Sequence, residues 1–182
     1  MNAIEELVAR NKIHQLADRY ALAVDGKDIE GLAALFVEDV DNGRYGPGRE
    51  GVRTYFDTIL RGFHCSMHLV ANHVIEFDGD HQARGVVYCR AHHHVLEPEH
   101  WYDRALAYWD TYDRVGDDWF FRRRRLKAWY TQRFAHPLHG TERVEAEPGT
   151  EGPGRGSRMP EAFPTFEAFW LGSAAPPAPP RP

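Results

Sequence analysis

The order of two hydrophobic periodicities limits what this chain can fold into. Over roughly the first 60 residues the apolar side chains recur at helical spacing, whereas from residue 67 onward they alternate among β-branched and aromatic residues. The alternating part divides into the segments 67–77, 83–96, 104–114 and 119–130, which short turns rich in Gly, Asp, Glu and Pro separate. Strands joined by such short turns are antiparallel, because a parallel pair needs a long crossover. Helices followed by an antiparallel meander predict an α+β fold.

The helical part is predicted to contain three helices. The first covers residues 3–24, the second is short and covers residues 28–36, and the third covers residues 48–60. Between the last two, residues 41–48 have the Asn, Gly and Pro content of turns. This composition places Tyr45 in a loop or at a strand end.

The length of 182 residues fits one domain with an extension. We predict a domain over residues 1–134 and an extended Pro- and Gly-rich tail over residues 135–182, which cannot bury a core of its own. Within the tail, the segment 163–170 has four large aromatic residues that would be costly to leave in water. We expect it to dock on the domain or on a neighbouring subunit, although Pro164 argues against an independent helix there.

Charge and cysteine usage exclude several classes of function. The net charge of -5 argues against a nucleic-acid binder, and a strand would divide the run Arg122–Arg125 between its two faces. Cys65 and Cys89 lie in apolar segments without the spacing of paired ligands, so we expect reduced thiols. The sequence shows neither a signal peptide nor an apolar run of membrane-spanning length, which predicts a cytoplasmic protein without a membrane partner.

One carboxylate and one imidazole stand out as a candidate catalytic pair. The apolar face of the first helix consists of Ile13, Leu16, Ala17, Tyr20, Ala21 and Val24. Asp25 follows directly on that face, and a buried carboxylate needs a cation or a hydrogen-bond donor. His68, inside an apolar strand segment, is the candidate partner. Two simpler interpretations stay open: Asp25 could cap the following helix, and His68 could be an ordinary hydrogen-bonded histidine of the core.

Alternation along the strand segments sorts the histidines and tyrosines. Within residues 85–95, one face carries Val87, Cys89, Ala91, His93 and Val95, and the other carries Tyr88, Arg90, His92 and His94. His93 is therefore the histidine expected to point inward. Consecutive strand residues cannot converge on one ion, so we predict no metal site and no cofactor. Tyr108 and Tyr112 share a face, where they could donate hydrogen bonds to a substrate or simply pack in the core.

Several stretches of the sequence together resemble one known family. They are Tyr20, Asp25-Gly26-Lys27-Asp28, Tyr45, the stretch from Met67 to Ile75, the stretch from Tyr108 to Asp113, and Asp118-Trp119-Phe120. From about Ile4 to Phe134 the chain resembles a SnoaL-like domain, a group within the nuclear-transport-factor-2-like fold. The resemblance implies a cone-shaped barrel in which N-terminal helices pack on a curved antiparallel or mixed sheet. The tail has no counterpart in it.

Within this fold the chain is most similar to cofactor-free lyases, namely scytalone dehydratase, hexachlorocyclohexane dehydrochlorinase and the bile-acid dehydratases. The resemblance implies that Asp25 orients His68, which removes a proton from the substrate. The residues implied as proton donors or as holders of the leaving oxygen are Tyr45, Tyr108 and His93, and the candidate substrate-binding residues are Tyr20, Asn72 and Trp129. The expected reaction is the dehydration of a small hydrophobic, oxygenated molecule such as a polyketide, steroid or terpenoid.

Because one scaffold can host many functions, two alternatives stay open. An isomerase or polyketide cyclase would use the same dyad, and a binding or assembly module would not be catalytic. We also expect a homo-oligomer, a dimer or trimer, since relatives of this fold commonly form them. The outward sheet face supports this expectation, because its aromatic and polar residues suit a self-complementary interface.

Overall fold

The computed structural model describes residues 1–134, 160 and 163–172. Its helices are α1 (Ala3–Asp25), α2 (Ile29–Ala34), the 3-10 helix η1 (Gly43–Tyr45), α3 (Gly48–Leu60) and α4 (Pro164–Leu171). Its strands are β1 (Cys65–Asp78), β2 (Gln82–Leu96), β3 (Glu99–Val115) and β4 (Asp118–Phe134). The predicted order of helices and strands is confirmed. Strand β3 begins earlier than predicted, because a turn of only two residues separates it from β2.

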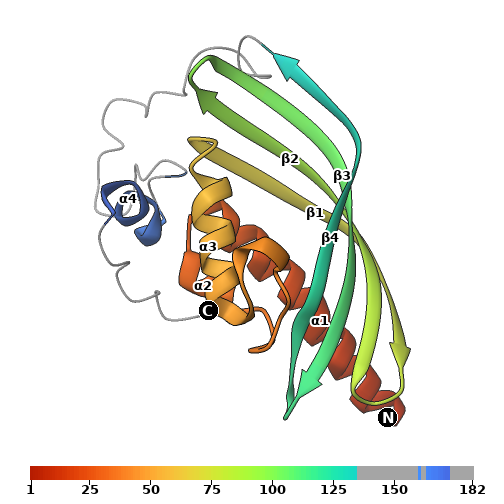
Figure 1. The fold of residues 1–182 in the computed structure, drawn as a ribbon. Helices are drawn as coiled ribbons and strands as arrows, with labels where there is room; N and C mark the ends of the chain where they lie inside the picture. Colours follow the sequence, from red (N-terminus) through yellow and green to blue (C-terminus); the bar gives the residue numbers. More distant parts are fainter. Residues whose placement is uncertain (135–159, 161–162, 173–182) are drawn as a thin grey trace, which may run out of the picture.

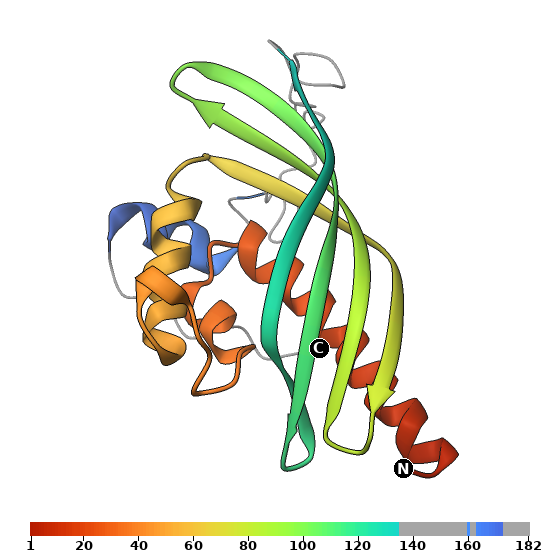
Figure 2. The ribbon, with the colours of Figure 1, turned by 45° about the vertical axis from the view of Figure 1, so that its right-hand side comes forward.

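The strands form one four-stranded antiparallel sheet in the order β1-β2-β3-β4. The sheet curves strongly, and helices α1, α2 and α3 gather on its concave side (Figures 1 and 2). Helix α1 packs against β1 and β4, and the core fills the space between helices and sheet. The predicted α+β architecture is confirmed. Within the described residues, no helix is long and apolar enough to cross a membrane.

Helix α1 has well-defined ends. Asn2 accepts hydrogen bonds from the backbone N–H groups of Ile4 and Glu5, and the Glu5 side chain accepts one from the Asn2 N–H, which makes a capping box. The helix ends at Asp25 and the chain then reverses through Lys27, whose φ of 56° is in the left-handed region. Asp28 begins α2 by accepting a hydrogen bond from the Gly31 N–H at 2.8 Å. Asp28 therefore caps α2, and Asp25 is free for another role.

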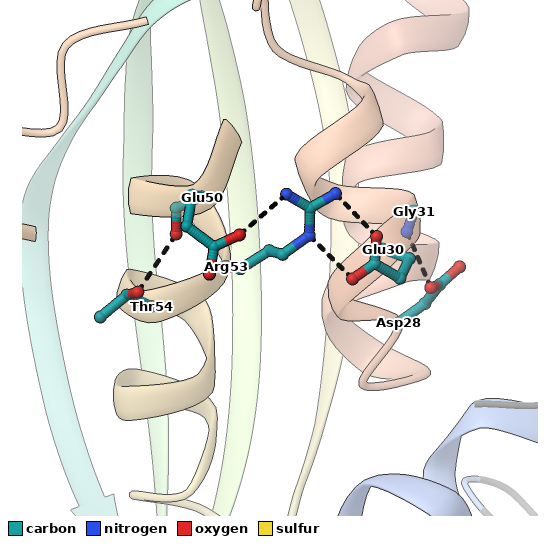
Figure 3. Close-up of polar contacts among 6 residues, drawn as sticks. All are labelled: Asp28, Glu30, Gly31, Glu50, Arg53 and Thr54. Carbon is teal, nitrogen blue, oxygen red and sulfur yellow. Dashed lines mark hydrogen bonds and ion pairs between the residues drawn. The ribbon is translucent and has the colours of Figure 1, made fainter. Parts of the chain in front are cut away.

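Arg53 ties α3 to α2 (Figure 3). Its guanidinium donates two hydrogen bonds to the carboxylate of Glu30 at 2.8 and 2.9 Å, and a weaker one to Glu50 at 3.3 Å. All three side chains are at least partly exposed, so each pair contributes less than about 1 kcal/mol to stability. The planar fork mainly fixes how the two short helices lie together.

A bulge in β1 and a glycine in β2 make room for the side chain of His73 between the sheet and the helices. The pairing of β1 with β2 shifts register between Val70 and His73. An extra residue of this kind bends a strand and re-aims the side chains that follow it. Gly85 pairs with Ile75, just beyond the bulge, and a Cβ on Gly85 would lie 3.0 Å from His73 Nε2 and 2.9 Å from the Val74 carbonyl oxygen. Only glycine lets the strands approach this closely around His73.

The aromatic segment of the tail forms helix α4, which docks on the domain that precedes it. Pro164 occupies the first turn, where its missing N–H costs nothing, and Gly172 ends the helix with a φ of 66°. Phe166 and Phe169 are buried. The expectation that Pro164 disfavours a helix is thus overridden, because burial of the aromatic face stabilises a helix that would not form alone. The remaining tail prediction, an extended chain from residue 135, lies largely outside the described residues.

We expect Gly85→Ala to lower the free energy of unfolding by about 1–3 kcal/mol, because the backbone and His73 must shift to accept the added methyl group. Urea unfolding followed by circular dichroism measures the change. The neighbouring exposed substitution Arg84→Ala is the control and should cost less than about 1 kcal/mol, since it removes only a surface ion pair with Glu76. Equal losses in the two variants would contradict the close approach at Gly85.

Candidate active site

Asp25, the last residue of α1, accepts three hydrogen bonds from the beginning of β1. Its Oδ1 accepts one from Ser66 Oγ at 2.6 Å and lies 2.6 Å from His68 Nδ1. Its Oδ2 accepts one from the His68 backbone N–H at 2.8 Å. The Asp25 and His68 side chains are only 12% and 5% exposed. The structure therefore brings the two residues of the candidate pair together in a buried site.

The contacts of Asp25 assign the tautomer of His68. An ionised carboxylate can only accept hydrogen bonds, so His68 Nδ1 must carry the proton that Asp25 accepts. In the neutral ring the free electron pair is then on Nε2. Among the described residues, no hydrogen-bond partner of Nε2 is found. His68 can thus take a proton through Nε2, and Asp25 would stabilise the imidazolium that forms.

His93 packs beside this pair as a neutral ring. Its ring is stacked on Tyr102 at 4.5 Å between centroids and makes edge contacts with Phe63 at 4.8 Å and His68 at 5.4 Å. Burial lowers the pKa of His93 far below its usual range, and the nearby imidazole of His68 lowers it further. The structure places His93 at the dyad as predicted, but burial disfavours the imidazolium form that a proton donor would need.

A second buried polar centre lies on the same side of the sheet. Arg124 of β4 binds Asp110 of β3 through two hydrogen bonds, Nε to Oδ1 at 3.0 Å and Nη2 to Oδ2 at 2.7 Å. Burial acts to lower the pKa of Arg124, but the Asp110 carboxylate outweighs this effect and raises it, so the guanidinium stays charged. Simple alternation from the buried Trp119 and Phe121 would have turned Arg123 inward. The register shift of β4 at Arg122 turns Arg124 inward instead, while Arg123 and Arg125 are exposed, so the sequence pattern could not single out Arg124.

Two of the predicted tyrosines surround this guanidinium. Arg124 Cζ lies 4.1 Å from the ring centroid of Tyr108 and 4.2 Å from that of Tyr20, with Phe121 completing the aromatic wall at 4.3 Å. Burial raises the pKa of both tyrosines, so their hydroxyls stay protonated. Asp110 accepts hydrogen bonds from only two of the five N–H groups of the guanidinium. This centre therefore offers hydrogen-bond donors to an oxygen or a negative charge.

Cys89 lies between the two centres. On β2 it stands between the residue paired with His68 and the residue paired with Tyr108. Burial raises the pKa of the Cys89 thiol to about 11, while Arg124 acts to lower it and Asp25 to raise it. The thiol is thus within electrostatic range of both. The Asp25–His68 pair and the donors around Arg124 thus lie on either side of Cys89.

A chain of hydrogen bonds continues from the second centre towards α1. Tyr112 donates to Asp110 Oδ2 at 2.9 Å, and its oxygen lies 3.0 Å from His73 Nε2. Because the hydroxyl gives its only proton to Asp110, Nε2 of His73 must carry the proton of the second bond. His73 Nδ1 is then an acceptor, and it is buried with no hydrogen-bond partner among the described residues. Burial lowers the pKa of His73 to about 4.

The other predicted site residues lie apart from the dyad. Tyr45, in η1, packs its ring on Tyr55 at 5.2 Å between centroids. Asn72 is exposed at the β1 bulge, and Trp129 is 69% exposed on the convex face against Tyr88. The structure therefore places Asn72 and Trp129, two candidate substrate-binding residues, away from the pair. Both lie at bulges, where an extra residue breaks the alternation that the sequence pattern assumes.

Other features of the described residues add no chemistry to this site. Neither cysteine forms a disulfide. Within residues 1–134, 160 and 163–172, no group of three His, Cys, Asp or Glu side chains converges as a metal-ligand set. An open hollow of about 380 Å³, lined among others by Asp78, His81 and Asp113, lies at the opposite end of the strands from His68.

The chain belongs to the family of SnoaL-like domains, whose model matches residues 5–125. This range includes both buried polar centres. The resemblance inferred from the sequence is thereby confirmed, together with its fold of N-terminal helices on a curved antiparallel sheet.

Solved structures show the same fold. A protein provisionally named a scytalone dehydratase, from Novosphingobium aromaticivorans DSM 12444, is 27% identical with a TM-score of 0.63, and the match covers 76% of this chain and 98% of that one. The hexachlorocyclohexane dehydrochlorinase LinA-type3 from Novosphingobium barchaimii LL02 is 21% identical with a TM-score of 0.66, over 72% of this chain and 94% of that one. No curated protein sequence matches the chain.

We expect acid to destabilise the protein through His73. Its pKa is about 4 in the folded state against an ordinary 6.5, so the unfolded state binds a proton first. The contribution to stability is complete above pH 6.5 and is lost as the pH falls towards 4. Urea unfolding at pH 7 and pH 5 should show a smaller pH dependence in His73→Gln, which keeps a donor for Tyr112 but does not titrate.

The exposed substitution His81→Gln is the control for this titration and should keep the pH dependence of the wild type. His93 titrates in all three proteins and therefore cancels in the comparison. If His73→Gln lost as much stability as the wild type between the two pH values, the neutral state assigned to His73 would be wrong.

Proposed function

We propose that the protein is a cofactor-independent lyase, a dehydratase, which acts in the cytoplasm on a small hydrophobic, oxygenated molecule such as a polyketide, steroid or terpenoid. The observation that carries this proposal is the buried pair in which Asp25 holds His68 Nδ1 at 2.6 Å and leaves Nε2 as a base. The likeness to a protein provisionally named a scytalone dehydratase supports the choice of an elimination.

The reaction begins when His68 Nε2 takes a proton from a carbon next to a carbonyl group. The electron pair of the broken C–H bond stays on the substrate, and Asp25 stabilises the imidazolium. This electron pair then forms a carbon–carbon double bond while the neighbouring C–O bond breaks. The leaving hydroxyl departs as water when it gains a proton, and His68 returns to its neutral state when it gives up the proton it took.

The Arg124 centre suits the oxygen end of such a substrate. Its remaining N–H groups, together with the neutral hydroxyls of Tyr20 and Tyr108, can donate to an oxygen on which negative charge develops. His93 contributes in a different way, because its neutral ring packs against the ring of His68. Because a positioned base alone supplies about 10²–10⁴-fold of rate, these donors and the exclusion of water must supply the rest.

Two other functions use the same scaffold. An isomerase or polyketide cyclase would begin with the same proton transfer, and the donors around Arg124 would then hold an enolate oxygen. Mass spectrometry separates these cases, since dehydration removes the mass of water and isomerisation leaves the mass unchanged. A non-catalytic binding or assembly module would have no use for a base held in one tautomer, so the hydrogen-bonded pair favours an enzyme.

We expect Asp25→Asn to fold normally and to lower turnover by about 10²–10⁴-fold, because an amide can accept a hydrogen bond but cannot compensate an imidazolium. His68→Ala should lower turnover at least as much. Formation of a product lighter by one water, measured across a panel of hydroxylated ketones, is the assay. The exposed substitutions Asp78→Asn and His81→Ala are matched controls and should keep wild-type turnover. Wild-type turnover in both dyad variants would remove the pair from the mechanism.

We also propose that the protein assembles as a homo-oligomer, a dimer or trimer, through the convex face of its sheet. The exposed aromatic side chains of this face include Tyr88, Trp109, Trp129 and Tyr130. Aromatic residues surrounded by charged groups such as Arg90 are typical of protein interfaces. The proposal commits to a second copy of this chain, because closed symmetric assemblies are the common outcome for a self-complementary face.

Sedimentation at micromolar concentration should therefore give a multiple of the 20.9 kDa chain mass. Trp129→Glu should shift the equilibrium towards the single chain, because it places a charge at the centre of the aromatic face. Val115→Glu, at an exposed position near the end of β3, is the control and should leave the assembly intact. A wild-type protein that sediments as one chain would contradict the proposal.

A further inference from the structure

Helix α4 packs on the turn that follows Asp25. Thr165 Oγ1 donates a buried hydrogen bond to the carbonyl oxygen of Gly26. The ring of Phe163 comes so close that a Cβ on Gly26 would lie 2.9 Å from its Cδ1. In Figures 1 and 2, α4 lies beside α3, at the end of the molecule where α1 ends. A segment distant in sequence thus touches the residue next to the proposed catalytic carboxylate.

Lys27, the next residue of this turn, is buried under α4. It is only 2% exposed, and its ammonium donates to the carbonyl oxygens of Leu60 at 2.6 Å and Phe63 at 2.7 Å. Three aromatic rings complete its surroundings: Nζ lies 4.0 Å from the ring centroid of Phe63, 5.2 Å from that of Trp170 and 5.4 Å from that of Phe169. Two of these three rings come from α4.

The surroundings of Lys27 are suited to a positive charge. Helix α1 ends at Asp25 and α3 ends at Leu60, and the last carbonyl groups of a helix carry partial negative charge. Carbonyl oxygens can only accept, and aromatic faces attract cations. Burial lowers the pKa of Lys27 to about 7, while Cys65 and Asp25 act to raise it and Arg61 to lower it. The ammonium therefore joins two helix ends and the cover that α4 provides.

Helix α4 also contacts the chain that leads into β1. The ring of His64 is stacked with Trp170 at 6.0 Å between centroids and meets Phe166 edge-on at 5.6 Å. The Arg61 guanidinium lies 4.6 Å from the ring centroid of Phe169. Strand β1 begins just after His64 and carries the donors that bind Asp25. Helix α4 thus contacts both the turn that follows α1 and the chain that leads into β1, which are the two segments that meet at the Asp25–His68 pair.

We propose that Lys27 is a positioning residue for the Asp25–His68 pair and that α4 is the clamp that holds Lys27 in place. Lys27 fixes the turn after Asp25 to the end of α3 and to Phe63, so it sets how far the end of α1 lies from the beginning of β1. Without it, that separation would be held only by the hydrogen bonds of Asp25 and by the packing of α1 against β1. The inference rests on the proposed function only in taking this pair as the proton-abstracting group.

The test follows the proton on His68 Nδ1, which needs no substrate. A proton that an imidazole shares with a carboxylate gives a low-field NMR resonance, and Asp25→Asn, which removes the carboxylate, assigns it. Lys27→Met keeps the bulk of the side chain without its charge, and Thr165→Val removes only the hydrogen bond to Gly26. Leu171→Ala is the matched control, since Leu171 is in the same helix but 72% exposed. Amide exchange of residues 165–171 reports whether α4 stays docked.

We expect Lys27→Met and Thr165→Val to reduce the amide protection of α4 and to speed exchange of the His68 Nδ1 proton with water by about tenfold or more. Leu171→Ala should change neither rate. A His68 proton that exchanges at the wild-type rate in both variants overturns the proposal, whether or not α4 has loosened. Should Lys27→Met fail to fold, Thr165→Val alone decides in the same way.

This outcome is separable from that of the proposed function. If the His68 proton responds as expected but no hydroxylated ketone is turned over by the wild type, the clamp stands and the dehydratase proposal fails. If the wild type is a dehydratase and the proton does not respond, only the clamp fails.

Discussion

A carboxylate buried at the end of α1 is the constraint on which the rest of the site depends. An ion taken out of water is costly unless donors replace the water it loses. For Asp25 these donors are the Ser66 hydroxyl, the backbone N–H of His68 and the ring Nδ1 of His68. All three lie within 2.8 Å of the carboxylate, and all come from one short stretch of β1. The beginning of β1 must therefore pass directly by the end of α1. The curvature of the sheet and the short helices between these elements serve that approach.

The two buried centres of the concave face solve the same electrostatic problem in different ways. Arg124 and Asp110 are both charged and neutralise each other, so this centre can stay fixed during a reaction. Asp25 instead faces the imidazole of His68, which in the proposed reaction takes up and returns a proton. In the proposed reaction, a proton would thus move at the Asp25–His68 pair while the Arg124–Asp110 pair, on the other side of Cys89, stays unchanged.

Local pattern explains the part of the fold and site that could be predicted. Helical spacing along α1 leads to Asp25 on the buried face, and strand alternation turns His93 and Tyr108 inward. The need of a buried carboxylate for a donor makes His68 its candidate partner, and the family resemblance then implies the roles of the two residues. The positions of Asn72 and Trp129 could not be predicted, because nothing in the residue types marks the bulges that break alternation there.

Contacts between distant segments decide two features that the local sequence pattern does not predict, the helix that begins at Pro164 and the burial of Lys27. Pro164 predicts a break, yet it fits the first turn of α4, whose stability comes from burying Phe166 and Phe169. A lysine after glycine in a turn suggests an exposed residue. Lys27 is buried only because the ends of two helices and an aromatic segment from the far end of the chain meet around it.

Charge alone does not explain why a lysine lies so close to the dyad. While His68 is neutral, the ammonium of Lys27 helps to compensate the Asp25 carboxylate, which acts in turn to raise the pKa of Lys27. Once His68 takes a proton, the same ammonium repels the imidazolium. As a point charge, Lys27 therefore opposes the protonation of His68. Burial, which lowers the pKa of Lys27 to about 7, weakens this opposition because part of the population is then neutral near neutral pH. The net electrostatic gain is therefore small, and the role that we propose for Lys27 is a geometric one, in which its two carbonyl contacts hold the end of α1 beside the strand that carries the proposed base.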